Sequence, residues 1–181
     1  MIKKILLGLV ALVVIIIVAF VAIVSMQPEE FKVTRQATIP APAAKVFDHV
    51  NDLQKWETWS PWAKLDPNAR ETISTPAAGK GASFAWAGNN EVGEGKMTIT
   101  ESRPNEQILI NLEFIKPFEG TSLTEFTFEP KGDQTLVTWT MSGKNNFVGK
   151  AVSLFMDCDK MCGDQFNQGF ENMKVAVQSA P

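Results

Sequence analysis

Few side chains in this sequence have the types and spacing that catalysis or metal binding requires. The chain has no tyrosine and one histidine, His49, and its two cysteines are Cys158 and Cys162. It contains no nucleophile motif, no glycine-rich phosphate loop before a helix and no paired-cysteine metal frame. We expect no cofactor. We also expect no metal site, because His49 is the only histidine and has no cysteine near it in the sequence. His49 itself ends a short predicted helix and is expected to face solvent.

An acid and a base for proton transfer, if the protein uses them, would come from two predicted strands. Arg35 falls on the apolar side of its strand, and Glu101 shares the parity of Met97 and Ile99. A buried arginine beside a carboxylate could orient a carbonyl or carboxylate ligand. The sequence favours the alternative, in which the guanidinium group of Arg35 reaches solvent and Glu101 lies beyond the buried part of its strand. The catalytic residues are unknown, with Arg35 and Glu101 as the candidates.

The two cysteines lie four residues apart in a segment with helical periodicity. This spacing puts both thiols on one helix face, but their Cβ vectors run parallel, so a disulfide within the helix would be strained. In an oxidising compartment Cys158 and Cys162 could still pair, or form a bridge between chains. The favoured interpretation is that both pack as small apolar residues.

Hydrophobic periodicity predicts the elements that would position these side chains. Residues 31–39 alternate apolar with polar and predict a strand. A short amphipathic helix follows over 43–50, with Pro42 as its first residue. A second short helix, capped by Asn51 or Asp52, cannot continue past Pro61.

The sequence from residue 70 to 142 predicts an antiparallel meander whose strands are separated by turns rich in glycine, proline and asparagine. The apolar residues on four of these strands should point to one face. Helical spacing then runs over 148–177 and predicts a long amphipathic helix with a break near 158–163. The predicted strands are 70–74, 82–87, 95–102, 107–114, 121–129 and 135–142.

This order of elements, with the segments 38–47, 51–56 and 59–62, resembles the SRPBCC (START/helix-grip) superfamily and most of all its polyketide cyclase/dehydrase group. The resemblance covers about residues 31–177. It implies an α+β helix-grip fold, in which a seven-stranded antiparallel sheet wraps around a long C-terminal helix with a deep hydrophobic tunnel between them.

The resemblance implies much less about chemistry. Its members include lipid carriers, hormone-type binders, aromatic cyclases, chaperone activators and dioxygenase subunits, so the fold does not give the function. The dioxygenases need two histidines and a carboxylate for iron, which a chain with one histidine cannot supply. The cyclases use polar groups inside the cavity, and this chain lacks the phenol of tyrosine.

Aromatic and sulfur-containing side chains are the stronger indication of function. They would line a wide, adaptable apolar cavity if the sheet does not close tightly on the helix, and a filled core is the alternative. The resemblance favours the cavity. The predicted ligand-binding residues are Trp59, Trp62, Trp86, Met97, Ile99, Ile110, Leu112, Phe114, Phe126, Phe128, Trp139, Met141, Phe155, Phe166, Phe170 and Met173.

An uncharged apolar run over residues 5–26 predicts a transmembrane anchor. As a helix it would span about 33 Å, enough for a hydrocarbon core of about 30 Å. A secretory signal has a shorter apolar region of about 7 to 15 residues and a small-residue cleavage site, which Ser25 and Met26 match poorly.

The charges on either side of this run predict its orientation. Lys3 and Lys4 place residues 1–4 in the cytoplasm and the domain, 27–181, on the far side, which is the periplasm if the source is bacterial. Of the 17 basic residues only 15 remain when Lys3 and Lys4 are set aside, against 20 acidic residues. An acidic domain of this kind disfavours nucleic acid and anionic lipid head groups as partners.

Three functions are consistent with the sequence. The first is a membrane-tethered binding module for a hydrophobic small molecule, such as a lipid or an aromatic metabolite, held between sheet and helix. The second is a cyclase- or dehydratase-type enzyme acting on an apolar substrate. The third is a protein-interaction or envelope-stress domain that uses the fold as a platform. The lack of catalytic groups favours the first.

Overall fold

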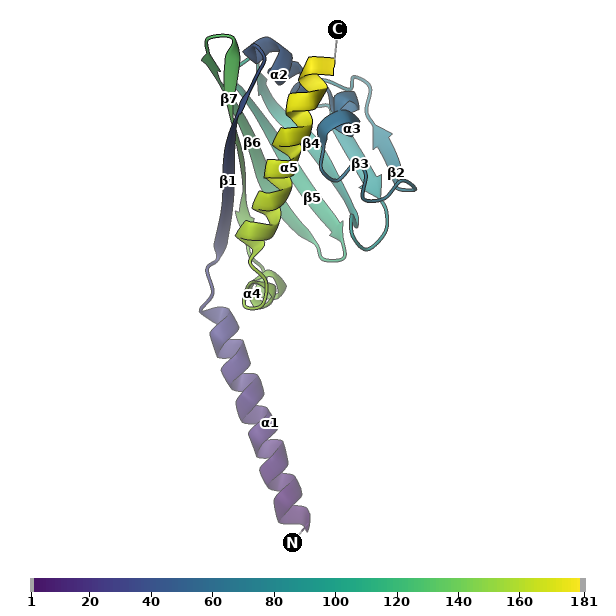
Figure 1. Cartoon of the computed structure of the whole chain (residues 1–181). Helices are drawn as coiled ribbons and strands as arrows, with labels where there is room; N and C mark the ends of the chain where they lie inside the picture. Colours follow the sequence, from purple (N-terminus) through teal and green to yellow (C-terminus); the bar gives the residue numbers. More distant parts are fainter. Residues whose placement is uncertain (1, 180–181) are drawn as a thin grey trace.

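A computed structural model describes residues 2–179 of the chain, and its elements follow the predicted order (Figure 1). The helices are α1 (Ile2–Ser25), α2 (Ala43–Asn51), the 3-10 helix η1 (Leu53–Lys55), α3 (Trp56–Trp59), α4 (Phe147–Ser153) and α5 (Cys158–Ser179). The strands are β1 (Glu30–Ile39), β2 (Arg70–Ile73), β3 (Ser83–Ala87), β4 (Glu94–Arg103), β5 (Gln107–Lys116), β6 (Gly120–Lys131) and β7 (Gln134–Lys144).

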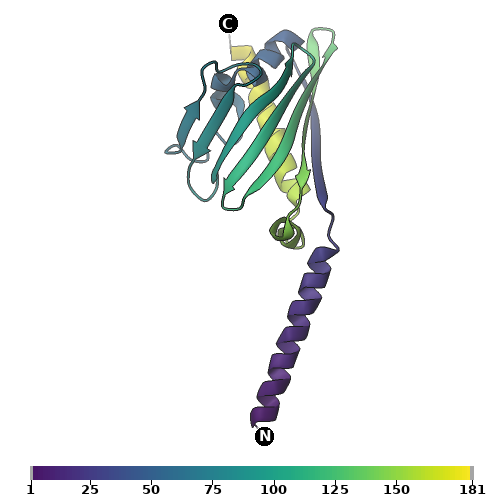
Figure 2. The same ribbon diagram turned by 180° about the vertical axis from the view of Figure 1, so that it is seen from behind.

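The seven strands form one antiparallel sheet in the order β1-β7-β6-β5-β4-β3-β2. Six strands follow one another as hairpins, and the first strand returns to pair with the last, with Arg35 opposite Trp139. The sheet curves around α5, which crosses its concave face, while residues 2–179 place no helix on the other face (Figures 1 and 2). The predicted α+β helix-grip architecture is confirmed.

The position of α5 depends on a close contact with β7. The Trp139 ring stacks on Phe166 of α5, with ring centroids 4.0 Å apart and an interplanar angle of 6°. One turn further along the helix, a Cβ atom on Gly169 would lie 2.9 Å from Trp139 Cζ3 and 3.2 Å from Pro61 Cδ. Glycine is therefore required at 169, because a larger residue would push the helix away from the sheet.

The break in the C-terminal helix lies at residues 154–157 and not at 158–163, so this boundary prediction was wrong. Local capping explains the difference. Asn146 Oδ1 accepts a hydrogen bond of 2.8 Å from the amide of Gly149 at the start of α4. Asp157 Oδ1 accepts one of 2.9 Å from the amide of Lys160 and so begins α5 before Cys158.

Helix α1 projects from the end of the domain at which β1 begins (Figure 1). Within it, Lys3–Ser25 is long and apolar enough to cross a membrane, with a mean hydropathy of 3.5. Its side chains are exposed along almost the whole length. Val24, in the last turn, is the exception and is 0% exposed.

Replacing Gly169 tests the contact between α5 and β7. Gly169→Val should destabilise the fold by about 1–3 kcal/mol, because the core around Trp139 has no room for the new side chain. The measurement is urea unfolding of residues 27–181.

Gly120→Val is the matched control, because a Cβ atom at Gly120 would have no neighbour within 4 Å. We expect its stability to change by less than about 0.5 kcal/mol. Equal stability of the two variants would mean that α5 does not pack on Trp139 as described.

Candidate functional site

The predicted ligand-binding residues gather on the concave face of the sheet and on the helices that cover it. In β5 the buried side chains Ile108 and Ile110 alternate with outward-facing residues, and Leu112 and Phe114 continue the same parity. Phe155 is the member that lies apart, because it follows α4 and is 78% exposed. All the others lie in or beside the apolar interior.

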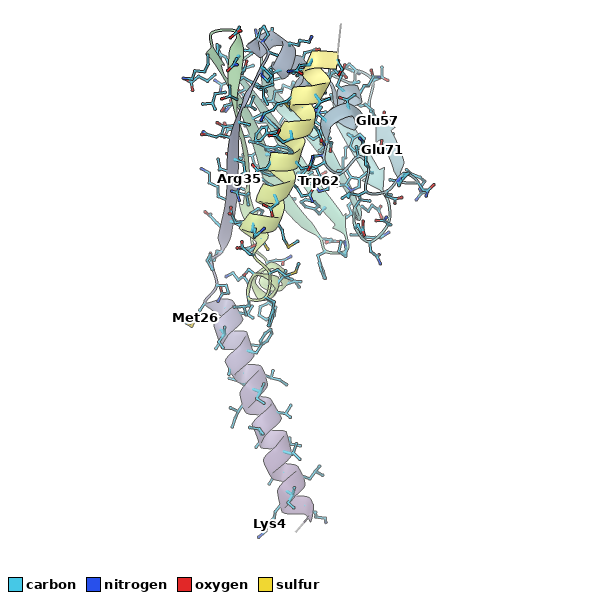
Figure 3. The ribbon with its side chains drawn as sticks, viewed as in Figure 1. Lys4, Met26, Arg35, Glu57, Trp62 and Glu71 are labelled. Carbon is cyan, nitrogen blue, oxygen red and sulfur yellow. The ribbon has the colours of Figure 1, made fainter. Side chains whose placement is uncertain are left out.

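Aromatic rings fill the centre of this interior. Around Trp139 lie Phe126 at 4.7 Å between ring centroids, Trp59 at 5.7 Å, Trp62 at 5.9 Å and Phe170 at 6.0 Å. Figure 3 shows Trp62 beside α5, in front of the sheet. Most of these ring pairs meet edge to face, a geometry that aromatic rings prefer and that stabilises the cluster. The β7 side of the interior is therefore occupied by protein.

Burial falls steadily toward the end of the domain from which α1 projects. Along β5, Ile108 and Ile110 are buried, Leu112 is half-buried and Phe114 is 37% exposed. Along α5, Phe170 and Phe166 are buried, whereas Cys162, nearer the start of the helix, is half-buried. Helix α5 lies against β1 and α3 and leaves the ends of β3, β4 and β5 less covered. The interior is thus closed at its far end and less covered near α1.

Two aromatic side chains meet at this less covered end. Trp86 of β3 and Phe114 of β5 lie on either side of Gly95 in β4, with ring centroids 6.4 Å apart. A Cβ atom on Gly95 would lie 2.5 Å from the Trp86 ring, so only glycine lets the two rings converge. The indole of Trp86 is also held by a 3.0 Å hydrogen bond from Nε1 to the Val92 carbonyl. Trp86 and Phe114 form a fixed apolar floor at this position.

One polar group of the concave face lacks the partner that burial normally requires. The indole Nε1 of Trp139 is fully buried and has no hydrogen-bond partner among the described residues. Ser122 and Thr124 of the neighbouring β6 are buried residues whose hydroxyls make no hydrogen bond in the described part of the chain, but these two oxygens are not fully enclosed. An unpaired buried donor costs about 1–3 kcal/mol, so a ligand acceptor that reached the Trp139 indole would gain that energy.

Buried polar groups elsewhere in the core are paired. Trp59 Nε1 donates to the His49 carbonyl at 2.9 Å, and Thr135 Oγ1 donates to the Ala41 carbonyl at 2.8 Å. His49 is itself buried, with Nδ1 2.8 Å from the Lys45 carbonyl, so the expectation that it faces solvent was wrong. His49 lies on the buried face of α2, and this helix packs against the sheet and α5.

The two catalytic candidates do not come together, because β7, β6 and β5 separate the strands that carry them. Glu101 follows a register shift in β4 that pairs it with Leu109, so it faces away from α5, contrary to its expected parity. Its carboxylate lies 3.2 Å from Arg103 Nε.

Arg35 lies on the concave side of β1, where its guanidinium group binds Asp159 at the start of α5 (Figure 3). Arg35 Nη2 donates to Asp159 Oδ2 at 2.9 Å and to the Asp159 carbonyl at 3.0 Å. The pKa of the Asp159 carboxyl lies below its ordinary value, chiefly because of this hydrogen bonding, while desolvation acts in the opposite direction. Arg35 thus joins the edge strand to α5.

Both cysteine thiols are free, with Cys158 exposed and Cys162 half-buried. Burial raises the pKa of the Cys162 thiol, and the neighbouring Cys158 and Asp159 act in the same direction. Within residues 2–179 no group of three or more His, Cys, Asp and Glu side chains is placed to hold a metal ion.

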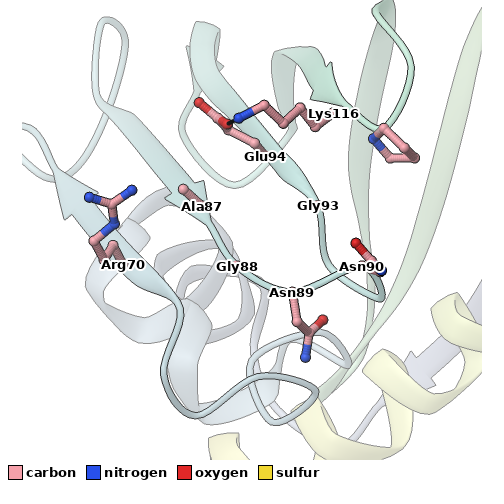
Figure 4. Close-up of a pocket in the computed structure, with 9 residues that line it drawn as sticks. Arg70, Ala87, Gly88, Asn89, Asn90, Gly93, Glu94 and Lys116 are labelled. Carbon is pink, nitrogen blue, oxygen red and sulfur yellow. Dashed lines mark ion pairs between the residues drawn. The ribbon is translucent and has the colours of Figure 1, made fainter.

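Two pockets that the sequence analysis did not anticipate lie on the surface. The first, of about 360 Å³, lies around the β3–β4 turn, where Lys116 Nζ is 2.6 Å from Glu94 Oε2 (Figure 4). The second, of about 320 Å³, is lined in part by Glu57 and Glu71 (Figure 3). Burial, and then the charge of Glu57, raise the pKa of Glu71. Loops build most of both pockets, so no periodic or motif signal could have indicated them.

Comparison with known proteins identifies the family. A sequence profile of the family described as polyketide cyclase / dehydrase and lipid transport matches residues 30–178. The chain belongs to this family. Membership in the polyketide cyclase / dehydrase and lipid transport family associates the chain with hydrophobic ligand binding or a cyclase-type role. The search of curated proteins returned no match.

Solved structures support the same fold. Protein CV1439 from Chromobacterium violaceum is 14% identical, with a TM-score of 0.61 over 82% of this chain and 98% of that chain. Mll3558 from Rhizobium loti is 18% identical, with a TM-score of 0.60 over 81% of this chain and 96% of its own. The Aha1 dimer from Colwellia psychrerythraea is 18% identical, with a TM-score of 0.59 over 82% and 97%. At these identities the similarity concerns the fold alone.

The lowered pKa of Asp159 gives a pH-dependent test of the Arg35 contact. A carboxyl whose pKa is lower in the folded than in the unfolded chain stabilises the fold above its unfolded-state pKa and loses this contribution as the pH falls. Arg35→Gln should therefore raise the pKa of Asp159 toward its ordinary value of 3.8 and remove this part of the acid-induced loss of stability.

Carboxyl-carbon NMR titration of residues 27–181 measures this pKa directly. Lys160→Gln is the control, because Lys160 pairs with Asp164 and not with Asp159. An Asp159 pKa that is the same with and without Arg35 would contradict the assigned contact.

Proposed function

We propose that this protein is a membrane-tethered module that binds a hydrophobic small molecule on the concave face, between the sheet and α5. The observation that carries the proposal is the loss of burial toward one end of an otherwise closed apolar interior, where Leu112, Phe114 and Trp86 are only partly covered. Membership in a family described by cyclases and lipid transport supports the same class of ligand.

The energetics of this end favour an apolar occupant. Covering apolar surface stabilises a complex by roughly 25 cal/mol per Å², and the partly covered side chains here are large. Leu112, Phe84 and Cys162 pack against the core and still retain exposed surface. A ligand inserted between β3–β5 and the first turns of α5 would complete their burial.

The unpartnered polar groups specify one further property of the ligand. Trp139 Nε1 can only donate a hydrogen bond, and the hydroxyls of Ser122 and Thr124 can donate or accept. A molecule with an apolar body and a carbonyl or carboxyl oxygen would satisfy these groups, which have no partner among the described residues. Fatty acyl compounds and aromatic ketones both have this composition.

Binding accounts for this face better than catalysis does. A cyclase or dehydratase needs an ionisable group beside the substrate to move a proton. Of the two candidates, Arg35 is bound to Asp159 at the sheet edge and Glu101 is paired with Arg103 on the opposite face. Among the described residues of the concave face, the indole of Trp139 and the hydroxyls of Ser122 and Thr124 make no hydrogen bond.

The proposed tether is α1, with its N-terminus in the cytoplasm and the domain on the far side of the membrane. Its length and hydropathy suit a bilayer, and Lys3 and Lys4 precede the apolar run. Tethering would hold the binding face close to a membrane and raise the local concentration of apolar ligands around it.

Ligand binding can be tested with oleate and residues 27–181 by native mass spectrometry. Leu112→Glu should weaken oleate binding at least about tenfold, because a carboxylate would replace an apolar contact on the concave face. Near-ultraviolet circular dichroism checks that the variant keeps its tertiary packing.

The matched control is Leu123→Glu, since Leu123 is exposed on the neighbouring strand β6 with the opposite parity. It should leave oleate affinity unchanged. Absence of saturable binding of oleate and of any co-purified apolar species to the unchanged chain would overturn the proposed function.

The topology predicts which side of the membrane carries the exposed thiol of Cys158. A membrane-impermeant maleimide should label Cys158 in right-side-out vesicles and not in sealed inside-out vesicles. Labelling in inside-out vesicles alone would reverse the orientation. A mature chain without α1, recovered outside the membrane fraction, would show that the apolar run is a cleaved signal.

A further inference from the structure

Exposed apolar side chains gather at the end of the domain from which α1 projects. Phe118 in the β5–β6 loop is 58% exposed, and Phe147 and Val148 in α4 are exposed as well. Phe155 and Met156, just after α4, continue the same surface. Four of the seven residues of α4 are apolar, yet none of its residues is fully buried. We call these five side chains the apolar end surface.

The apolar end surface is fixed to the end of α1 by direct contacts. Helix α4 lies against α1, whose Val24 is fully buried (Figure 1). Residues 26–29 alone connect α1 to β1. This connector is held at Asn145, whose amide donates to the Glu29 carbonyl at 2.8 Å and whose Nδ2 donates to the Pro28 carbonyl at 3.2 Å.

The β5–β6 loop belongs to the same assembly. Asn146 Nδ2 donates to the Glu119 carbonyl at 3.2 Å, next to Phe118, and Asn146 Oδ1 caps α4. Lys150 of α4 lies 3.8 Å from Glu29 of the connector. The domain is therefore held at a defined position on the end of the span, which leaves little freedom for it to move away.

The length of α1 indicates how deep this contact lies relative to the bilayer. A hydrocarbon core of about 30 Å takes about 20 helical residues, so with Lys3 and Lys4 at one interface the other boundary falls near Val24. Helix α4 packs at this level of α1. We propose that the apolar end surface docks on the lipid leaflet around α1, with Phe118, Phe147 and Phe155 in the interfacial region. This inference rests on the proposed tether.

The chemistry of the surface suits lipid rather than a charged partner. Large apolar side chains beside a spanning helix partition into the boundary between head groups and acyl chains. The acidic balance of the domain means that apolar contact, and not attraction to anionic head groups, would provide the affinity. Docking would also turn the less covered end of the interior, with Phe114 and Leu112, toward the leaflet. The bound molecule would then reach the concave face directly from the membrane.

Depth-dependent quenching in the full-length chain tests this docking. With Cys158→Ser and Cys162→Ala as background, single cysteines replace Phe118, Phe155, Val175 or Leu12 and carry a fluorophore. Val175 is an exposed apolar control on α5, and Leu12 lies inside α1. The chain is reconstituted in phosphatidylcholine vesicles that contain nitroxide-labelled lipids.

We expect nitroxide lipids to quench the labels at 118, 155 and 12 and to leave the label at 175 bright. Quenching at 12 with none at 118 and 155 would overturn the docking and leave the tether standing. No quenching at 12 would show that α1 does not cross the bilayer, so that both the docking and the tether fail.

A charge substitution provides a second readout, with the fluorophore kept at position 155. Phe118→Asp should shift the docking equilibrium at least about tenfold toward the undocked state, because a carboxylate replaces an exposed phenylalanine that docking would insert into the leaflet. Quenching at 155 would fall accordingly. The control Val175→Asp should leave it unchanged, and equal quenching in both variants would contradict the docking.

Discussion

The packing of Trp139 against α5 is the interaction on which the rest of the structure depends. The ring lies flat on Phe166 and meets the backbone of Gly169, so the helix approaches β7 as closely as an aromatic ring allows. Arg35 joins the same helix to β1 through Asp159. Together these contacts hold α5 over one side of the sheet, and the ends of β3, β4 and β5 are left with less cover.

This asymmetry gives the domain two unlike ends. At the far end, Phe47, Leu53 and Trp56 of α2, η1 and α3 seal the interior, and polar groups there find backbone partners. At the end near α1, aromatic side chains remain partly exposed on the concave face, and the Ser122 hydroxyl makes no hydrogen bond in the described part of the chain. A ligand that enters at this end would add to an existing core rather than replace it.

Local sequence patterns predicted most of the architecture. Alternation along 31–39 and along the later strands predicted the sheet, and its residues with inward parity became the aromatic interior. The predicted inward orientation of Glu101 was wrong, because Thr100 is an extra residue in a bulge and the sequence pattern does not reveal that bulge. The prediction that His49 faces solvent was wrong for a different reason, because the burial of a helix end depends on the elements that pack against it.

The candidate site depends on tertiary contacts more than the fold does. Which apolar side chains remain partly exposed depends on where α5 crosses the sheet, and that follows from one ring and one glycine far apart in sequence. The unpartnered Trp139 indole is likewise a tertiary property, because a tryptophan in a strand pattern gives no sign of its hydrogen-bond partner. The contact between α4 and α1 joins residues more than a hundred positions apart.

The most direct test of the account is the indole N–H resonance of Trp139 in residues 27–181, followed by ¹H–¹⁵N NMR as oleate is added. This resonance should shift on binding, together with the backbone amides of Leu112, Ser122 and Thr124, while the amide of His49 at the sealed end stays in place. Shifts confined to the surface pocket around Asn89 and Glu94, with the Trp139 indole unmoved, would show that the apolar ligand does not bind on the concave face.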